Sequence, residues 1–251
     1  MKIDNCQFES QITNHKSRIL SIVNELTILY EDNHVIVVNK KASDIVQGDK
    51  TGDETIPDTI KAYLKEKYQK PGNVFCGVVH RLDRPTSGAV VFARTSKALE
   101  RLNAQFRDKE TNKVYWAIVE SKPEKSSATL THYLKKNEKQ NKSYASLTET
   151  PGSKKAVLHY TLIASSDKYH LLEVRLETGR HHQIRVQLST IGCIIKGDVK
   201  YGARRSNPDG SVGLHARALT FTHPTSKEPI SIIAPVPEDS LWQFFQSAVS
   251  K

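Results

Sequence analysis

The sequence predicts an α+β fold, in which a long, mixed and largely antiparallel β-sheet carries a few flanking helices. Runs rich in β-branched residues recur along the chain and are separated by short polar turns, which is typical of paired strands. Few segments show apolar residues at helical spacing. A chain of 251 residues can bury one substantial core without disulfides, so we expect one domain.

The first two strands are predicted to form a hairpin. Residues 26–30 and 35–40 are β-branched runs on either side of a polar turn. Residues 1–25 are polar and weakly periodic, and we expect them to be an N-terminal extension with a short helix around residues 17–26. The domain is then expected to span residues 26–251.

Two segments are predicted to be helices that flank the sheet. In residues 57–68 apolar side chains recur at helical spacing, while lysines occupy the other face. Ser96 is expected to cap a second helix. The side chains expected to face the sheet are Ile60, Tyr63 and Leu64 in the first helix and Leu99, Leu102 and Phe106 in the second.

The second half of the chain returns to strand-like composition. Residues 113–119, 156–163 and 170–176 favour strands, with a turn at residues 165–167. Between them, residues 135–142 are basic and rich in amides. This pattern fits a solvated hairpin tip, and in a nucleic-acid-binding protein such a tip can also contact phosphates.

The charge balance favours a polyanionic partner. Lys and Arg number 37 against 27 Asp and Glu, giving a net charge of +10 and a pI of about 9.4. Charge alone does not separate RNA, DNA and an anionic membrane surface. The three cysteines are scattered, and no apolar run has the length of a signal peptide or membrane span, so we expect a reduced, cytoplasmic protein that does not enter membranes.

The segment from His80 to Gly88 carries the strongest chemical signal. It places Asp83 between two arginines, beside two hydroxyls and a turn-forming Pro and Gly, directly before the apolar run 89–93. We interpret it as a rigid loop that leads into a core strand. An aspartate between two cations should stay ionised, which suits a nucleophile or an electrostatic partner. The alternative is a surface turn with ion pairs.

A second dense cluster spans residues 179–188. Thr178 and Gly179 are expected to begin a helix that ends at Gly192, and Arg185 could reach from this helix into a cleft. The adjacent histidines, at 181 and 182, raise the hypothesis of a zinc site. Neighbours in a helix point about 100° apart and no Cys or carboxylate follows at ligand spacing, so we expect no metal and one buried, hydrogen-bonded histidine.

These segments resemble the RluA family of RNA pseudouridine synthases. Members carry His-Arg-Leu-Asp followed shortly by Ser-Gly, and later Gly-Arg-x-His-Gln-Ile/Leu-Arg, as residues 80–88 and 179–185 do here. The chain departs from the family at Lys41, where members usually have proline. Further similar blocks are residues 26–40, 113–115, 197–202, 214–216 and 221–224.

The resemblance implies a pseudouridine synthase fold with a central RNA-binding cleft, and residues 26–251 as its catalytic domain. It implies isomerisation of uridine to pseudouridine in structured ribosomal or transfer RNA, with no cofactor. We also expect a monomer. The catalytic residues implied are Asp83, Tyr115, which would stack on the base, and Arg185, which would pair with Asp83.

A uridine within folded RNA must be flipped out to reach a buried carboxylate. Arg81 could fill the gap that the base leaves, or it could bind a phosphate or a backbone carbonyl. The residues expected to contact the substrate are His80, Arg81, Arg84, Arg180, His182 and Gln183.

Other functions are weaker on the residues themselves. A protein kinase catalytic loop has Asp before Leu, whereas Leu82 precedes Asp83 here, and no glycine-rich phosphate loop is present. A catalytically silent RNA-binding module is the alternative from another class, because the basic charge would serve it equally. Such a module would need neither Asp83 nor Tyr115.

Overall fold

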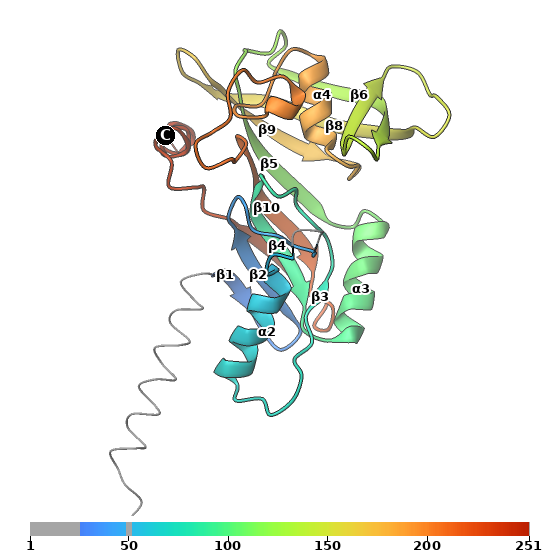
Figure 1. The fold of residues 1–251 in the computed structure, drawn as a ribbon, viewed down its shortest axis with the longest axis vertical. Coiled ribbons are helices and arrows are strands. Elements are labelled where there is room, and N and C mark those ends of the chain that lie inside the picture. Colours follow the sequence, from blue (N-terminus) through green and yellow to red (C-terminus); the bar gives the residue numbers. More distant parts are fainter. Residues whose placement is uncertain (1–25, 49–51, 251) are drawn as a thin grey trace, which may run out of the picture.

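One 11-stranded sheet runs through the described residues of the computed structural model, which are 26–48 and 52–250. Its main path is β1-β2-β4-β10-β5-β9-β8-β6-β7, while β3 pairs with β4 and β11 with β10 (Figure 1). Within the described residues, β10 and β4 are parallel and the other strand pairs are antiparallel. The predicted mixed, largely antiparallel sheet is confirmed.

The strands are β1 (Thr27–Glu31), β2 (Val35–Lys40), β3 (Gly77–Val78), β4 (Ser87–Ala93), β5 (Asn112–Val119), β6 (Ser127–Asn137), β7 (Lys142–Ser146), β8 (Lys154–Ser165), β9 (His170–Leu176), β10 (Leu214–Thr222) and β11 (Pro229–Ile233). The helices are α2 (Ile56–Lys67), α3 (Ser96–Arg107), α4 (Gln183–Thr190) and α5 (Ser240–Val249), with a 3-10 turn η1 (Val199–Tyr201).

Strands β2 and β4 are buried on both faces. Successive side chains of a strand point to opposite faces, and those of β2 divide accordingly. Ile36 and Val38 join the core cluster that includes α2, whereas Val35 and Val37 join the cluster that includes α3. The two predicted helices therefore cover opposite faces of the same pair of strands. Every residue of β4 is buried, as the apolar run 89–93 predicted.

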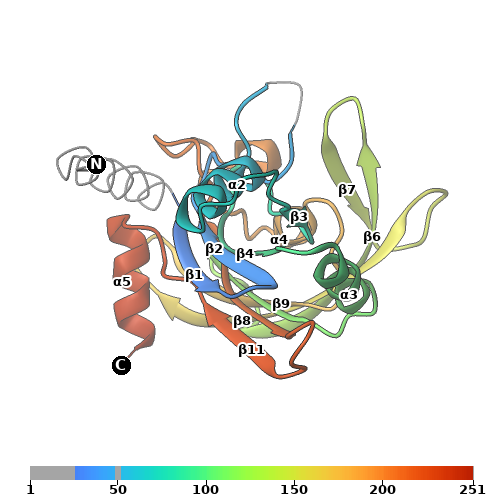
Figure 2. The same cartoon turned by 90° about the horizontal axis from the view of Figure 1, so that it is seen from below.

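The other half of the sheet carries α4 and the β6–β7 hairpin. Figure 2 shows this hairpin at the opposite end of the molecule from α5. Of the predicted basic tip, residues 135–142, only the turn 138–141 lies between β6 and β7, and the rest belongs to these two strands. None of the described helices is long and apolar enough to cross a membrane.

Two predicted helix starts are wrong. The cap of α3 is Thr95, whose hydroxyl accepts a hydrogen bond from the amide of Ala98, and Ser96 is already the first helical residue. Helix α4 begins at Gln183 rather than near Thr178, because His182 has a left-handed backbone (φ 52°) that cannot lie inside a helix. The helix expected around residues 17–26 lies outside the described residues, except for Leu26.

Helix α5 was not predicted. Asp239 caps it by accepting hydrogen bonds from the amides of Leu241 and Trp242. Trp242 and Phe245 are buried in a cluster with Trp116 of β5.

Candidate active site

The loop that carries Asp83 is fixed where β4 meets β10. The parallel pairing places Ser87 beside His215 and Gly88 beside Ala216, and the Ser87 hydroxyl hydrogen-bonds to His215 Nδ1 at 2.8 Å. Gly88 has a φ of 119°, and a Cβ there would collide with the backbone of Ala216. This close approach of two strands thus requires the glycine of the Ser-Gly pair, and the serine adds a hydrogen bond across it.

A buried lysine anchors the same loop from the other side. Lys40, at the end of β2, is 1% exposed, and its ammonium donates to the backbone carbonyls of Lys41, Arg84 and Thr86 at 2.8–3.0 Å. All three of its hydrogens thereby have acceptors. Burial lowers the pKa of Lys40 to about 8, although the charges of Asp44 and Asp83 oppose this shift.

We expect Lys40→Met to loosen the loop. Loss of three charge-assisted hydrogen bonds should lower the free energy of unfolding by about 2 kcal/mol, partly offset because no ammonium remains to be buried. Chemical denaturation measures this loss. Lys65→Met, which removes an exposed lysine from α2, is the control and should unfold like the unaltered protein. Equal stability of the two variants would contradict the anchoring role.

Arg185 joins two carboxylates. Its Nε and Nη2 bind Asp198 at 2.7 and 2.8 Å, and its Nη1 binds Asp83 at 3.1 Å. Arg185 and Asp198 are 5% and 1% exposed in their side chains, whereas Asp83 is 30% exposed. Burial lowers the pKa of Arg185, but the hydrogen bonds and charges of the two aspartates outweigh it, so the pKa is raised above its ordinary value. Asp198 therefore orients Arg185, and Arg185 holds the more accessible carboxylate.

A neutral histidine lies beside this pair. His182 Nε2 is 3.6 Å from Asp83 Oδ2, and its Nδ1 hydrogen-bonds to the Tyr201 hydroxyl at 2.9 Å. Burial, with the positive charge of Arg185, lowers the pKa of His182 to about 2. The rings of His181 and His182 stack with centroids 3.8 Å apart. One buried, hydrogen-bonded histidine is present as predicted, at position 182.

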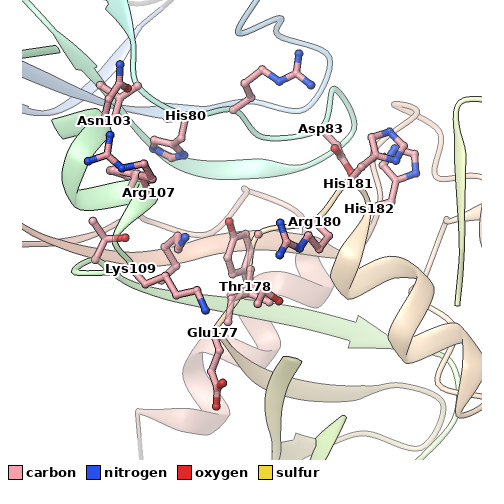
Figure 3. Close-up of a pocket in the computed structure, with 18 residues that line it drawn as sticks. His80, Asp83, Asn103, Arg107, Lys109, Glu177, Thr178, Arg180, His181 and His182 are labelled. Atoms are coloured by element: carbon pink, nitrogen blue, oxygen red, sulfur yellow. The ribbon is translucent and has the colours of Figure 1, made fainter. Parts of the chain in front are cut away.

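Asp83 lies where two clefts meet. The larger, of about 1010 Å³, is lined by Asp83, Tyr115 and residues of α3 (Figure 3). The smaller, of about 420 Å³, lies between residues 44–48 and Lys136 near the hairpin tip. Tyr115 is 9% exposed, and burial raises its pKa above the ordinary value, an effect to which the charge of Asp83 adds. Its phenol therefore stays protonated beside the carboxylate.

The residues predicted to contact substrate fall into two groups. Arg81 and Arg84 are exposed, and they donate to Gln47 and Asp53, respectively, at 3.0 Å. Arg81 lines both clefts and Arg84 the smaller one. Arg180 also lines the larger cleft, and its Nε donates to the carbonyl of Lys155.

His80 and Gln183 are held mainly by the protein. The His80 ring stacks on Phe106, and its Nε2 accepts from the amide of Val91, so that only part of it lines the larger cleft. Burial lowers the pKa of His80 to about 3. Gln183 is 3% exposed and lines neither cleft. Its amide oxygen accepts from the Thr178 hydroxyl and the backbone amide of Arg180, and its amide nitrogen donates to the carbonyl of Val157. Its geometry is that of a scaffold residue rather than a substrate contact.

The chain matches known proteins over most of its length. Residues 34–190 match the sequence model of the RNA pseudouridylate synthase family. An uncharacterized RNA pseudouridine synthase from Synechocystis is 35% identical over 84% of this chain and 66% of its own length. The ribosomal large subunit pseudouridine synthase D of Zymomonas mobilis is 35% identical over 85% of this chain and 70% of its own length.

The chain belongs to the RluA family of RNA pseudouridine synthases. It spans about two thirds of the length of these curated relatives. Human RNA pseudouridylate synthase domain containing 4 shares the fold, with a TM-score of 0.75 and 21% identity over 95% of this chain and 98% of that one. The resemblance based on the two motifs is thereby confirmed, as is the expected pseudouridine synthase fold.

Three residues of the site were missed from the sequence. Asp198 and Tyr201 lie in the family-like block 197–202, and Lys40 ends the block 26–40. The resemblance therefore included these residues but assigned no role to any of them. The signal that could have found them is chemical: an acid, a phenol and a lysine within otherwise family-like segments. Their partners, however, are set by tertiary structure.

Proposed function

We propose that this chain isomerises uridine to pseudouridine in large-subunit ribosomal RNA, with residues 26–251 as its catalytic domain. Asp83 is the catalytic carboxylate, and the reaction needs neither cofactor nor metal. The observation that carries this proposal is a partly exposed carboxylate at the meeting point of two clefts, held by a buried arginine. The names of several relatives support ribosomal RNA as substrate.

The reaction is balanced within the substrate. The bond from ribose C1′ to uracil N1 breaks, the base turns, C5 bonds to C1′, and the C5 proton is lost while N1 gains one. Asp83 attacks the ribose or the base, or abstracts a proton while stabilising a glycal-like species. Each route requires an ionised carboxylate, which Arg185 keeps in place.

Tyr115 and His182 complete the environment of the detached base. The protonated, buried ring of Tyr115 supplies an apolar face for uracil and excludes water that would hydrolyse an intermediate. His182 adds no charge beside Asp83, because its imidazole is neutral. Positive charge at the carboxylate therefore comes from Arg185.

The direct test uses purified protein and unmodified transcripts. We expect new pseudouridines in a large-subunit ribosomal RNA transcript, mapped by chemical modification and sequencing, and none in transfer RNA transcripts. Modification of transfer RNA alone would overturn the assignment of ribosomal RNA as the substrate. Modification of neither RNA would overturn the proposed activity. Analytical ultracentrifugation tests the expected monomer, and fractionation of cells tests the expected cytoplasmic location.

Arg81 is proposed to fill the gap left by the flipped base. It is exposed, lines both clefts, and has Gln47 as its hydrogen-bond partner, so it can swing away. We expect Arg81→Ala to slow reaction on structured RNA about tenfold to a hundredfold more than on a short flexible strand, since unstacking costs a few kcal/mol. Single-turnover rates on both substrates measure the difference.

Arg175→Ala is the control for this comparison. Arg175 lies on β9, pairs with Glu173 and lines neither cleft. Its loss should lower the single-turnover rates on both substrates slightly and by the same factor. If Arg81→Ala lowers both rates by the same factor, Arg81 has a structural or chemical role and does not assist flipping.

A further inference from the structure

The cleft that holds Asp83 continues beyond the catalytic residues. Its volume of about 1010 Å³ reaches the upper end of the range of roughly 300–1,000 Å³ that single small ligands occupy. Figure 3 shows Asp83, His181 and His182 at one end and Asn103 and Arg107, from α3, at the other. The space toward α3 is more than one flipped uridine requires.

Lys113 lines this cleft from β5. It is two residues from Tyr115, so both side chains lie on the same face of the strand. Its Nζ lies 5.4 Å from the centre of the Phe106 ring. The same Nζ would lie 4.0 Å from a Cβ built on Gly179. Lys113 is half-buried, and burial lowers the pKa of its ammonium.

The ammonium of Lys113 has no acidic partner in the part of the chain that the structure describes. The only cause of its lowered pKa is burial. Glu177 also lines the cleft, but its carboxylate is 2.6 Å from His159 Nε2. The other charged groups toward this end are cationic, namely Arg107, Lys109 and Arg180.

A half-buried cation without a partner costs free energy that a bound anion can offset. Short hydrogen bonds between an ammonium and a phosphate are among the strong polar contacts in proteins. A single-stranded RNA that places one uridine at Asp83 carries phosphodiesters on either side of it. The cation-lined end of the cleft matches this ligand in charge and in room.

We propose that Lys113 binds a backbone phosphate of the RNA next to the target nucleotide, so that the α3 end of the cleft holds at least one flanking nucleotide. The inference rests on the proposed function for the identity of the anion as RNA. It assigns Lys113 to substrate binding rather than to the chemical step.

The salt dependence of binding tests this role. The probe is a short single-stranded RNA with one central uridine, and its dissociation constant is measured over a series of salt concentrations. Lys113→Met should weaken binding about tenfold and reduce the slope of log K against log salt by about 0.7, the share of one phosphate on a single strand. Lys113→Arg should keep the slope.

Lys97→Met is the matched control. Lys97 is an exposed lysine at the start of α3 that lines neither cleft, so its loss changes net charge equally. If Lys113→Met and Lys97→Met have the same slope, the proposal is overturned. Should Lys113→Met fail to fold, Lys113→Gln replaces it, with the same expected slope.

A neutral linkage locates the phosphate. Methylphosphonate is placed at one linkage of the probe at a time. One position should weaken binding to the unaltered protein and to Lys97→Met but not to Lys113→Met, because that contact is already lost. If the loss of affinity from methylphosphonate adds to the loss from Lys113→Met at every linkage, Lys113 does not contact a phosphate.

The dissociation constant and its salt dependence do not depend on whether pseudouridine forms, so the two proposals fail separately. A normal Lys113 effect in a protein that forms no pseudouridine would overturn the proposed activity and keep the phosphate site. Pseudouridine formation with no effect of Lys113→Met on binding would keep the proposed activity and overturn the phosphate site.

Discussion

Asp83→Asn should abolish pseudouridine formation while the protein folds and binds RNA normally. The amide keeps the shape of the side chain but has neither the charge nor the nucleophilicity of the carboxylate, and loss of such a group costs about a thousandfold or more in turnover. The side chain is 30% exposed, so the change removes little packing. Release of tritium from carbon 5 of labelled uridine measures the reaction.

Two measurements make this result specific. Thermal unfolding and RNA binding of Asp83→Asn should stay close to those of the unaltered protein. Asp53→Asn is a matched control and should keep turnover close to that of the unaltered protein. Asp53 pairs with Arg84, which follows Asp83 in the loop, and both side chains are about half exposed. Turnover of Asp83→Asn within tenfold of the unaltered protein would refute the assignment.

Arg185→Ala should damage both stability and chemistry. It would leave Asp198, 1% exposed in its side chain, as a buried carboxylate without its cation. Breaking a buried ion pair from one side costs about 3–5 kcal/mol of unfolding free energy. It would also remove the hydrogen bond that holds Asp83, so the carboxylate can turn away and the chemical step should slow even when RNA is saturating.

A double variant separates the two effects. Adding Asp198→Asn to Arg185→Ala removes the unpaired buried charge, so much of the lost stability should return, while the chemical step stays slow because Asp83 still lacks its partner. Denaturation and single-turnover rates report them independently. If the double variant regains its rate together with its stability, Arg185 acts through folding alone.

The sequence was sufficient for the elements whose signals are local. The hairpin β1–β2, helices α2 and α3, and strands β5, β8 and β9 follow from side-chain periodicity, with ends shifted by a few residues. The pairing of Asp83 with Arg185 could be expected from the family resemblance, although the two residues are 102 positions apart. No periodicity would have indicated it.

What could not be predicted depends on tertiary contacts. The left-handed backbone at His182 shortens α4 at its start, and nothing in a His-His pair indicates it. Lys40 is important because it donates to the carbonyl of its neighbour Lys41 and to two carbonyls of the distant Asp83 loop. Asp198 is important because it binds a guanidinium 13 residues away. Composition cannot distinguish such groups from ordinary surface charges, because burial follows only from the whole sheet.

The position of β10 has a consequence for how the protein is made. This strand lies between β4 and β5, and its residue His215 holds Ser87, 128 positions earlier. During synthesis the ribosome must release residues 214–222 before the middle of the sheet can close. Until then β4 has an exposed edge, which favours aggregation. Nascent chains can therefore complete the Asp83 loop only after β10 has emerged, and we expect them to need protection until residues 214–222 have left the ribosome.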